Sequence, residues 1–525
     1  MSEYNNLNLL KNNHNIESEI NRLKKISKDN CNIQVFLDSK LKLAQLLENQ
    51  KEYDKAEQVY RLIERADSKE AFAVSRNNLG VLFGKLKQYD KAEKVFAEVS
   101  SEDFPKGFSR ICINLSIILK RNNKLADAKK LLENIKRNDG ECFFRARFVI
   151  GEIYLKLGEY DNAKIAFKDS KETYYYDSEC FMRILDISNK DISNNLINLR
   201  ENVYNILNCL ILDGKYEEYI CHYTRPSTAF SLLKDDTKDD NKPSKLRLST
   251  IKNVNDPTEG RILFDYFNLP NREIDIGSFI SCFTFNHDSL NQFRLYGKEN
   301  NQEASGVSIV FKKDFFSEYL GSCHSIECSR EKFVNNFSSL EEESNINAIT
   351  DGGINKLPVY RCIYLDNKYD YMKLAKRSEI DFYRESKSDE YTSYLCIIKE
   401  KEYEVKNNLN EIRVMLKDIL ENKDFNEPMH DLINYILLPL KFLVKHAAFE
   451  DEQECRMFFI TDLFDDRIQS SFNEKSMYLE YEPSVKENIK EIYLSIGAYQ
   501  YEDFFIRTLK DSSKVCRSRN PFRNK

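Results

Sequence analysis

The chain has 525 residues, of which 41% are hydrophobic and 31% are charged, and its formal net charge is −6. Such values are typical of a soluble protein with roughly two to four domains, and they give no global reason to expect nucleic-acid binding. Only 15 glycines occur. Neither a GxxxxGKS/T loop nor a GxGxxG motif after a strand is present, which disfavours P-loop NTPases and Rossmann dehydrogenases.

The thirteen cysteines show no CxxC pair, which predicts reduced thiols and a cytoplasmic protein. The first residues have neither an apolar core nor a cationic lead, so we expect no secretory signal. The longest apolar run, residues 432–444, is interrupted by Asn434, Pro439 and Lys441 and is too short to cross a bilayer. We therefore expect a soluble protein without a membrane partner.

A short motif recurs in the first half of the chain at nearly constant spacing. Its alanines are Ala56, Ala92, Ala128 and Ala163, which lie 36, 36 and 35 residues apart. An apolar residue and a small one precede each alanine, and a large apolar or aromatic residue follows four positions later. The small side chains would let paired helices approach closely, while the large ones fill the space between neighbours. A period this regular indicates a helical repeat array.

The pattern resembles tetratricopeptide repeats over residues 35–170. The resemblance implies an α-solenoid, with a degenerate turn at residues 213–216 as its cap, and we place this domain at residues 1–215. Its concave face would bind a protein or peptide ligand, or a second copy of the chain in a homo-oligomer. The other interpretation is that the array only scaffolds the second domain.

Strand-like runs replace the helical period in the second half of the chain. Helical stretches between them are predicted at Leu409–Leu420 and Met429–Ala447. Residues 216–525 therefore read as an α+β domain that follows the α-solenoid. The predicted strands are Tyr219–Tyr223, Leu246–Thr250, Phe279–Phe285, Val307–Phe311, Val359–Leu365, Glu454–Ile460 and Ile492–Ile496.

Two glutamates near the C-terminal end, Glu452 and Glu454, directly precede the apolar run Met457–Ile460. If the strand begins at the first of them, their side chains share one face, because side chains alternate along a strand. A pair of carboxylates beside a buried strand is costly unless the two are partnered, and it is a candidate for an active-site acid or anchor. Both glutamates could instead simply pair with Arg456 and Lys445.

A series of motifs in this domain resembles a bacterial family that is catalogued only as a domain of unknown function. Where members of that family commonly have a tryptophan before the acidic motif, this chain has Phe449, and it contains no tryptophan. The motifs are His222–Thr224, Leu248–Ser249, Asn255–Glu259, Ser281–Phe283, Tyr296–Gly297, Gly306–Val307, Lys445, Glu452–Arg456 and Ser518.

The order of a strand-borne histidine, central serine and tyrosine motifs and a late Glu-x-Glu is also similar to the His–Tyr–Glu arrangement of ADP-ribosyltransferases. That resemblance implies NAD as substrate. A carboxylate would stabilise the oxocarbenium-like state, a role we expect for Glu454, with Glu452 as its neighbour. The implied NAD-binding residues are His222 and Thr224 at the ribose, Tyr223 or Tyr296 at the nicotinamide, Arg294 or Arg456 at the pyrophosphate, and Ser281 in the central motif.

Each of these residues also has a structural interpretation. The tyrosines could be core residues, His222 a satisfied buried histidine, and Asn255–Pro257 an ordinary turn. Cys323, His324 and Cys328 lack a convincing fourth ligand, so we expect no metal site. A basic C-terminal tail could meet nucleic acid or simply be solvated; its cationic residues are Arg507, Lys510, Lys514, Arg517, Arg519, Arg523 and Lys525.

The sequence thus favours a repeat-regulated bacterial effector, a toxin or defence protein, whose second domain consumes NAD as an ADP-ribosyltransferase does. One alternative is a non-enzymatic interaction protein that binds a nucleotide or peptide. Another is an RNA-directed hydrolase or nuclease that uses the acidic cluster and the basic tail. Ligand-linked melting with NAD, RNA or divalent metal would separate these functions.

Overall fold

The structure is a computed structural model that describes residues 17–212, 216–234, 243–250, 259–273, 276–300, 302–316, 354, 356–472 and 476–520. The described residues form two compact units, one ending at Leu185 and the other starting at Asp186. Among the described helices, none combines the length and the apolar character that crossing a membrane requires.

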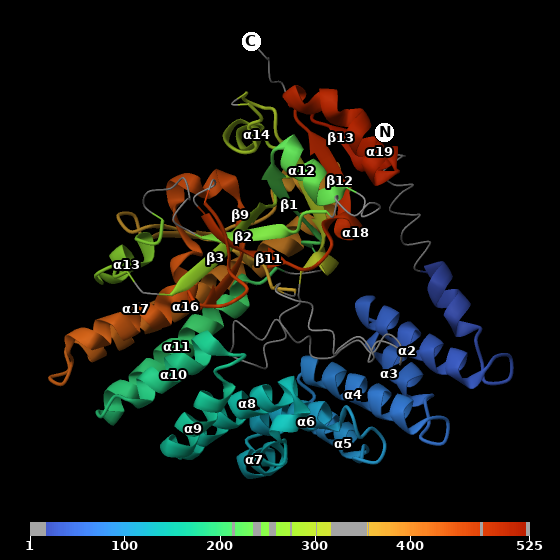
Figure 1. Cartoon of the computed structure of the whole chain (residues 1–525), viewed down its shortest axis with the longest axis vertical. Coiled ribbons are helices and arrows are strands. Elements are labelled where there is room, and N and C mark those ends of the chain that lie inside the picture. Colours follow the sequence, from blue (N-terminus) through green and yellow to red (C-terminus); the bar gives the residue numbers. More distant parts are fainter. Residues whose placement is uncertain are drawn as a thin grey trace. The chain divides into compact units, whose positions relative to one another are not determined.

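The first unit is entirely helical, and its helices follow one another as antiparallel pairs (Figure 1). Each helix packs against the next along the chain, as repeat units do. The helices are α2 (Ile33–Asn49), α3 (Tyr53–Arg61), α4 (Lys69–Lys85), α5 (Tyr89–Ala97), α6 (Phe108–Arg121), α7 (Leu125–Glu133), α8 (Glu141–Leu157), α9 (Tyr160–Ser170) and α10 (Tyr175–Leu185).

The small residues of the repeat motif lie where two helices come closest. The four motif alanines are fully buried. A Cβ atom added to Gly80 on α4 would come within 2.6 Å of the Phe96 ring on α5, and one added to Gly151 on α8 within 2.7 Å of the Phe167 ring on α9. The predicted pairing of a small residue with a large one is thus present at both positions.

The second unit opens with a long helix that packs on two later ones. Helix α11 (Lys190–Leu210) lies against α16 (Tyr391–Leu420) and α17 (Glu427–Lys441). By its contacts α11 belongs to the second unit, which therefore begins before this helix, whereas the boundary expected at residue 215 comes after it.

A ten-stranded sheet forms the centre of the second unit, with the strand order β10-β11-β2-β3-β1-β4-β12-β13, and β9 joins β3 to β5. A second sheet has the order β7-β6-β8. The strands are β1 (Tyr219–Thr224), β2 (Leu246–Thr250), β3 (Gly277–Thr284), β4 (Val307–Lys312), β5 (Tyr360–Arg361), β6 (Ile363–Asp366), β7 (Tyr371–Leu374), β8 (Val444–His446), β9 (Glu454–Thr461), β10 (Gln469–Ser471), β11 (Ser476–Tyr481), β12 (Ile489–Leu494) and β13 (Val515–Arg517).

Short helices connect these strands. They are α12 (Pro226–Leu233), α13 (Ile262–Phe267), α14 (Leu290–Leu295), α15 (Glu379–Arg384), α18 (Val485–Asn488) and α19 (Glu502–Leu509). The 3₁₀ helix η7 (Ala447–Glu452) leads from β8 into β9. The second unit is therefore a mixed domain of helices and strands, as its sequence predicted.

The sheet branches at β3. One edge of β3 pairs with β9 along its whole length, whereas the other edge pairs with β2 near its start and with β1 only at Thr284. Paired residues of antiparallel strands share a face. The pairs Cys282–Arg456 and Thr284–Glu454 therefore lie on one face, while Phe283 and Met457 lie on the other and belong to the main core.

Apart from shifted ends, such as those of α16, which begins at Tyr391, two predicted elements differ from the observed ones. The run predicted as one strand over Val359–Leu365 is divided between β5 and β6, which belong to different sheets. The helix predicted over Met429–Ala447 ends at Lys441, because the residues after it form β8, which pairs in parallel with β6. An apolar run near a helix end does not show from its periodicity where a strand begins.

Candidate functional site

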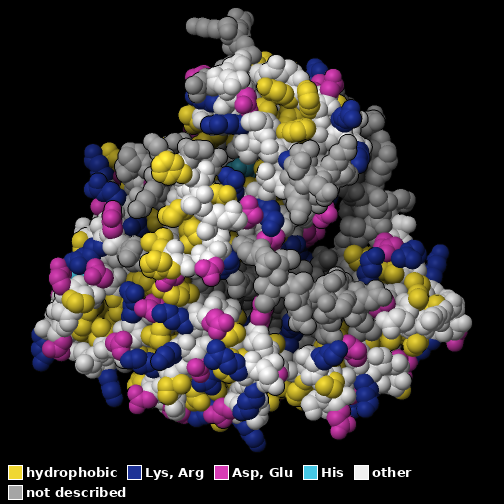
Figure 2. All heavy atoms as spheres, viewed as in Figure 1, with side chains coloured by type: hydrophobic (Ala, Val, Ile, Leu, Met, Phe, Trp, Pro, Cys, Tyr) yellow, Lys and Arg dark blue, Asp and Glu magenta, His cyan; other side chains and the backbone are white. Residues whose placement is uncertain are grey.

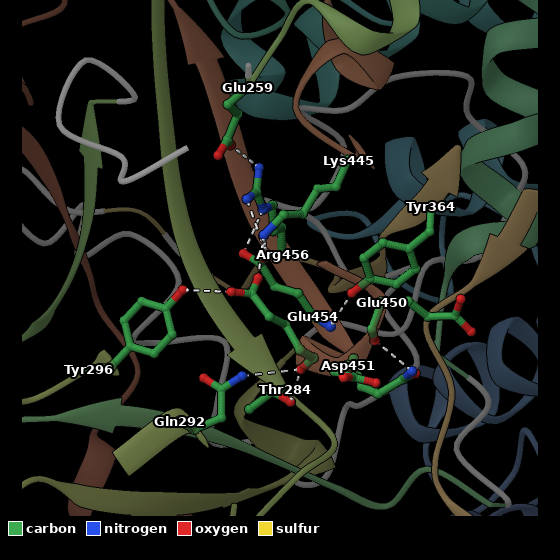
Figure 3. A network of polar contacts seen from close by, with 12 residues as sticks. Glu259, Thr284, Gln292, Tyr296, Tyr364, Lys445, Glu450, Asp451, Glu454 and Arg456 are labelled. Atoms are coloured by element: carbon green, nitrogen blue, oxygen red, sulfur yellow. Dashed lines mark hydrogen bonds and ion pairs between the residues drawn. The ribbon is translucent and has the colours of Figure 1, made fainter. Parts of the chain in front are cut away.

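Five charged side chains meet on the polar face of β3 and β9, and we call them the charged cluster: Glu259, Lys445, Glu452, Glu454 and Arg456. Lys445 lies in β8, Glu452 in η7, and Glu454 and Arg456 in β9, while Glu259 precedes α13. Figure 3 shows how these side chains converge. All five are mostly or fully buried, with side-chain exposures between 2% and 13%.

The two glutamates of the acidic motif converge for a different reason from the one expected. Strand β9 begins at Glu454, whereas Glu452 is the last residue of η7, so the two do not lie on one strand. Between them Gln453 has a left-handed backbone with φ 46° and ψ 47°. Its side chain holds this turn by accepting from the Lys376 backbone N–H at 2.6 Å and donating to the Glu450 carbonyl at 2.7 Å.

Lys445 bridges the two glutamates. Its ammonium lies 2.5 Å from Glu452 Oε2 and 2.5 Å from Glu454 Oε2. Burial alone would lower the pKa of Lys445, but the carboxylates of Glu454 and Glu452 outweigh it and raise the pKa. Lys445 is therefore a permanent cation at the centre of the cluster.

Glu454 is the most heavily bonded carboxylate of the cluster. In addition to Lys445, it accepts from Arg456 Nε at 2.7 Å and from Arg456 Nη2 at 3.1 Å. Burial opposes its ionisation, but the charges of Arg456 and Lys445 dominate and lower the pKa of Glu454 to about 2. This group cannot act as an acid near neutral pH and is a fixed negative charge.

Arg456 is also fully engaged. Its guanidinium binds Glu454 and Glu259, and it donates to the Phe442 carbonyl at 2.6 Å. The arginine is buried, with a side-chain exposure of 2%. In this arrangement it stabilises the cluster, and the expected pyrophosphate contact would require one of these bonds to open.

Glu452 contacts Tyr296, which directly follows α14. The Tyr296 hydroxyl donates to Glu452 Oε1 at 3.0 Å, and burial together with the charges of Glu452 and Glu454 raises the pKa of this tyrosine. Gln292, on the preceding helix α14, donates to the Glu452 carbonyl at 3.5 Å. Glu452 has fewer partners than Glu454 and a higher exposure, 13% against 9%.

His222 approaches the cluster from the other side of the sheet. It pairs in register with the core residue Ile309, and its Nδ1 lies 2.8 Å from the Cys282 carbonyl oxygen. Burial lowers the pKa of His222. The Cys282 thiol hydrogen-bonds to Glu454 on the opposite face, so a single residue separates the histidine from the carboxylate.

The structure brings the other expected NAD-binding residues to different places. Tyr223 is tied to a turn, where its hydroxyl donates to the Asn286 carbonyl at 2.7 Å. Ser281 lies on the core face, and its buried hydroxyl has no hydrogen-bond partner among the described residues. Thr224 is buried, whereas Arg294 is about half exposed and lies 3.8 Å from Glu303.

Two further contributors, Tyr364 and Thr284, had not been singled out in the sequence, and Cys282 had been named only as part of a motif. Besides the Cys282 thiol, the Tyr364 hydroxyl accepts from the Glu454 backbone N–H at 2.8 Å, and the Thr284 hydroxyl donates to the Glu452 carbonyl at 2.6 Å. Both support the backbone on each side of Gln453. Single tyrosines and threonines carry no local signal of such a role, which appears only in the strand register.

Within the described ranges, no group of three or more histidine, cysteine or acidic residues could hold a metal ion. Cys323, His324 and Cys328 lie outside the described residues, as do Asn255–Pro257 of the turn motif. On the face shown in Figure 2, lysines and arginines alternate with acidic side chains over the helices. In the basic tail, Arg517 pairs with Glu502 at 3.0 Å, while Arg523 and Lys525 lie outside the described residues.

Comparison with protein families gives a match in the first unit. None of the curated proteins matches the chain. Residues 144–173, which comprise most of α8 and all of α9, match the family model described as a tetratricopeptide repeat. The chain therefore contains a tetratricopeptide repeat in its helical first unit, a motif that commonly mediates protein interactions.

Proposed function

We propose that the protein is a repeat-regulated effector whose second unit consumes NAD in an ADP-ribosyltransferase-like reaction. The observation that supports this most is the charge balance of the buried cluster. Among the described residues, its three carboxylates, Glu259, Glu452 and Glu454, pair with two cations, Lys445 and Arg456. An uncompensated buried negative charge is costly, and a positively charged ligand group would balance it.

NAD carries such a group. Its nicotinamide ring is cationic, and when the N-glycosidic bond breaks, the bonding electron pair leaves with neutral nicotinamide while positive charge develops on the ribose. A fixed carboxylate next to that carbon stabilises the transition state. The nucleophile, water or an acceptor group, then forms the new bond at the same carbon and loses its proton to the solvent or to a base.

The proposal exchanges the roles expected from the sequence for the two glutamates. Glu454 is already neutralised by two cations, so we assign it to anchoring the cluster. Glu452 is bonded to one cation and to the Tyr296 hydroxyl, and we assign to it the stabilisation of the ribosyl cation. His222 would then support β3 through the Cys282 carbonyl and would not contact the ribose.

The repeats give the proposal its regulatory part. Tetratricopeptide repeats commonly bind proteins, so the first unit would bind a protein or peptide that controls the enzyme. Control of a NAD-consuming enzyme by a sensor array suits a toxin or a defence protein.

The test compares the ligand-linked melting of the full chain with NAD and with NADH, which differ in the charge of the nicotinamide ring. We expect NAD to raise the melting temperature more than NADH does, and Glu452→Gln to abolish that difference. Nicotinamide release should fall by about 100-fold or more in Glu452→Gln, since the charge is removed and the size is kept. Glu450→Gln is the matched control, because Glu450 lies in the same 3₁₀ helix but binds Tyr371.

Equal stabilisation by NAD and NADH, unchanged in Glu452→Gln, would contradict a charge-selective NAD site. A wild-type protein that shows neither NAD-linked stabilisation nor nicotinamide release, with or without cell lysate as a source of the activating partner, would rule out the function.

A further inference from the structure

Helix α14 and the residue after it bring the side chains of Gln292 and Tyr296 to Glu452, yet the helix is too short to hold its own position. It spans Leu290–Leu295, and it is followed directly by Tyr296. Six residues provide little helical stability of their own, so tertiary anchors must fix the helix. The anchors of α14 therefore decide where the Tyr296 hydroxyl lies.

The main polar anchor is Asp288, just before the helix, and it binds a segment from the end of the chain. Asp288 Oδ1 accepts from the Ser518 hydroxyl at 2.6 Å and from Asn520 Nδ2 at 2.8 Å. Its Oδ2 accepts from the Arg519 backbone N–H at 3.3 Å, and its backbone carbonyl accepts from Asn520 Nδ2 at 3.2 Å. These bonds join residues that are separated by about 230 positions in the sequence.

The C-terminal segment is itself fixed to the sheet. The Ser518 backbone N–H donates to the Leu494 carbonyl at 2.8 Å, and the Tyr499 hydroxyl donates to the Ser518 carbonyl at 2.6 Å. Ser518 is buried, with an exposure of 8%. Asp288 is thus tied to the edge of the ten-stranded sheet at β12 and β13.

The same turn also contacts β1 and the acidic motif. Ser289 donates its backbone N–H to the Tyr223 hydroxyl at 2.9 Å, and Asn286 Nδ2 donates to the Asp451 carbonyl at 3.0 Å. A displacement at Asp288 would therefore reach the backbone next to Glu452 as well as Tyr296.

We infer that Asp288 is a positioning residue, and that Ser518 and Asn520 of the C-terminal segment act through it to hold α14 and the Tyr296 hydroxyl against Glu452. The structural part of this inference stands without any substrate, whereas its effect on turnover rests on the proposed function.

The test uses variants of the full chain and a single introduced tryptophan as a fluorescent reporter. Because the chain has no tryptophan, and Leu295 on α14 is 57% exposed, Leu295→Trp places a single indole on the helix. In Asn520→Ala we expect hydrogen exchange of residues 290–296 to rise about tenfold or more, because both hydrogen bonds from Asn520 to Asp288 are lost, one of them to the charged carboxylate. The indole emission should shift at the same time, while exchange in β9 and α17 stays unchanged.

Two further variants separate positioning from general damage. Asn520→Asp places a second carboxylate against Asp288 and should raise hydrogen exchange further. The double variant with Asp288→Asn swaps the carboxylate and the amide between the two positions and should restore protection. Asn488→Ala is the control, since Asn488 Nδ2 makes a comparable bond, at 2.8 Å, to the Ser484 carbonyl elsewhere in the unit.

Unchanged hydrogen exchange in α14, or an equal rise throughout the second unit, would overturn the inference. Failure of the Asp288→Asn, Asn520→Asp double variant to regain protection would overturn it as well. If nicotinamide release occurs in the wild type, its kcat should fall about 10-fold to 100-fold in Asn520→Ala, with little change in KM. A local exchange effect in a protein that shows no turnover would leave the positioning role intact and contradict the proposed function instead.

Discussion

Glu454 is a carboxylate whose ionised form is favoured by the fold. Its pKa in the folded protein, about 2, lies below the ordinary value of 4.5, so its ionisation stabilises the folded state at any pH above about 4.5. That stabilisation is lost as the pH falls from 4.5 toward 2. The shift corresponds to a contribution on the order of 3 kcal/mol, because one pKa unit is about 1.4 kcal/mol.

We therefore predict that Glu454→Gln lowers the free energy of unfolding at pH 7 by roughly 3 kcal/mol or more, since Lys445 and Arg456 lose a shared partner. The difference from the wild type should shrink as the pH approaches 2. Urea unfolding at several pH values measures both effects, with Glu450→Gln as the reference. A constant difference over that range would mean that Glu454 does not carry the acid sensitivity.

At the scale of elements, helix packing in the first unit depends on two glycines that differ in what surrounds them. An added methyl at Gly80 meets the Phe96 ring at 2.6 Å, whereas one at Gly84, four residues further along α4, meets only the terminal Cδ1 of Ile118 at 2.9 Å. Alanine normally stabilises a helix interior by about 1 kcal/mol relative to glycine. The ring cannot move aside as easily as a methyl group.

Gly80→Ala is therefore expected to destabilise the first unit by about 1–3 kcal/mol, the usual effect of overpacking. Gly84→Ala should be neutral or stabilising. Urea unfolding followed by circular dichroism compares the two variants with the wild type. If both variants are equally stable, the small residue at position 80 is not required for the approach of α4 and α5.

The elements that could be predicted from sequence are those with a strong local pattern. The strand predicted at Leu246–Thr250 has the observed bounds of β2, and the predicted repeat alanines are all buried. Strands β7, β8, β10, β11 and β13 were not predicted, because most are three or four residues long and are defined by their partners more than by their composition.

The candidate site was predictable in its residue types more than in its geometry. The Glu-x-Glu motif and Lys445 are recognisable in the sequence, and they meet in the cluster. The left-handed turn at Gln453 is invisible to a periodicity argument, because it changes the direction of the chain within one residue. Ser281 and Arg294 were also expected in the site, but strand register and exposure, which depend on the whole domain, place them away from the cluster.

At the scale of the whole molecule, the two units have separate cores that contain buried thiols. Cys112 and Cys180 are buried in the first unit, and Cys221, Cys362 and Cys455 in the second, whereas Cys396 is exposed. Burial raises the pKa of the Cys112 thiol to about 11, so this group is protonated and unreactive in the folded state.

Pulsed alkylation across a urea gradient, followed by peptide mass mapping, should therefore modify Cys396 without denaturant and the five buried thiols only on unfolding. We predict that the thiols of the two units become reactive at different urea concentrations, because each core can unfold separately. Coincident curves for all five thiols would indicate a single cooperative unit. A reductant should leave the curves unchanged, since all the cysteines that the structure describes are free.

The bonding pattern of the charged cluster also restricts how the protein can evolve. Lys445 serves two glutamates, and Arg456 serves Glu454 and Glu259, so replacing either cation leaves a buried carboxylate without its cationic partner. Breaking a buried pair in this way typically costs about 3–5 kcal/mol, a large part of the stability of an ordinary domain. Descendants of this chain are therefore expected to keep the cluster whole or to replace several of its members together, and divergence should accumulate in the residues around it.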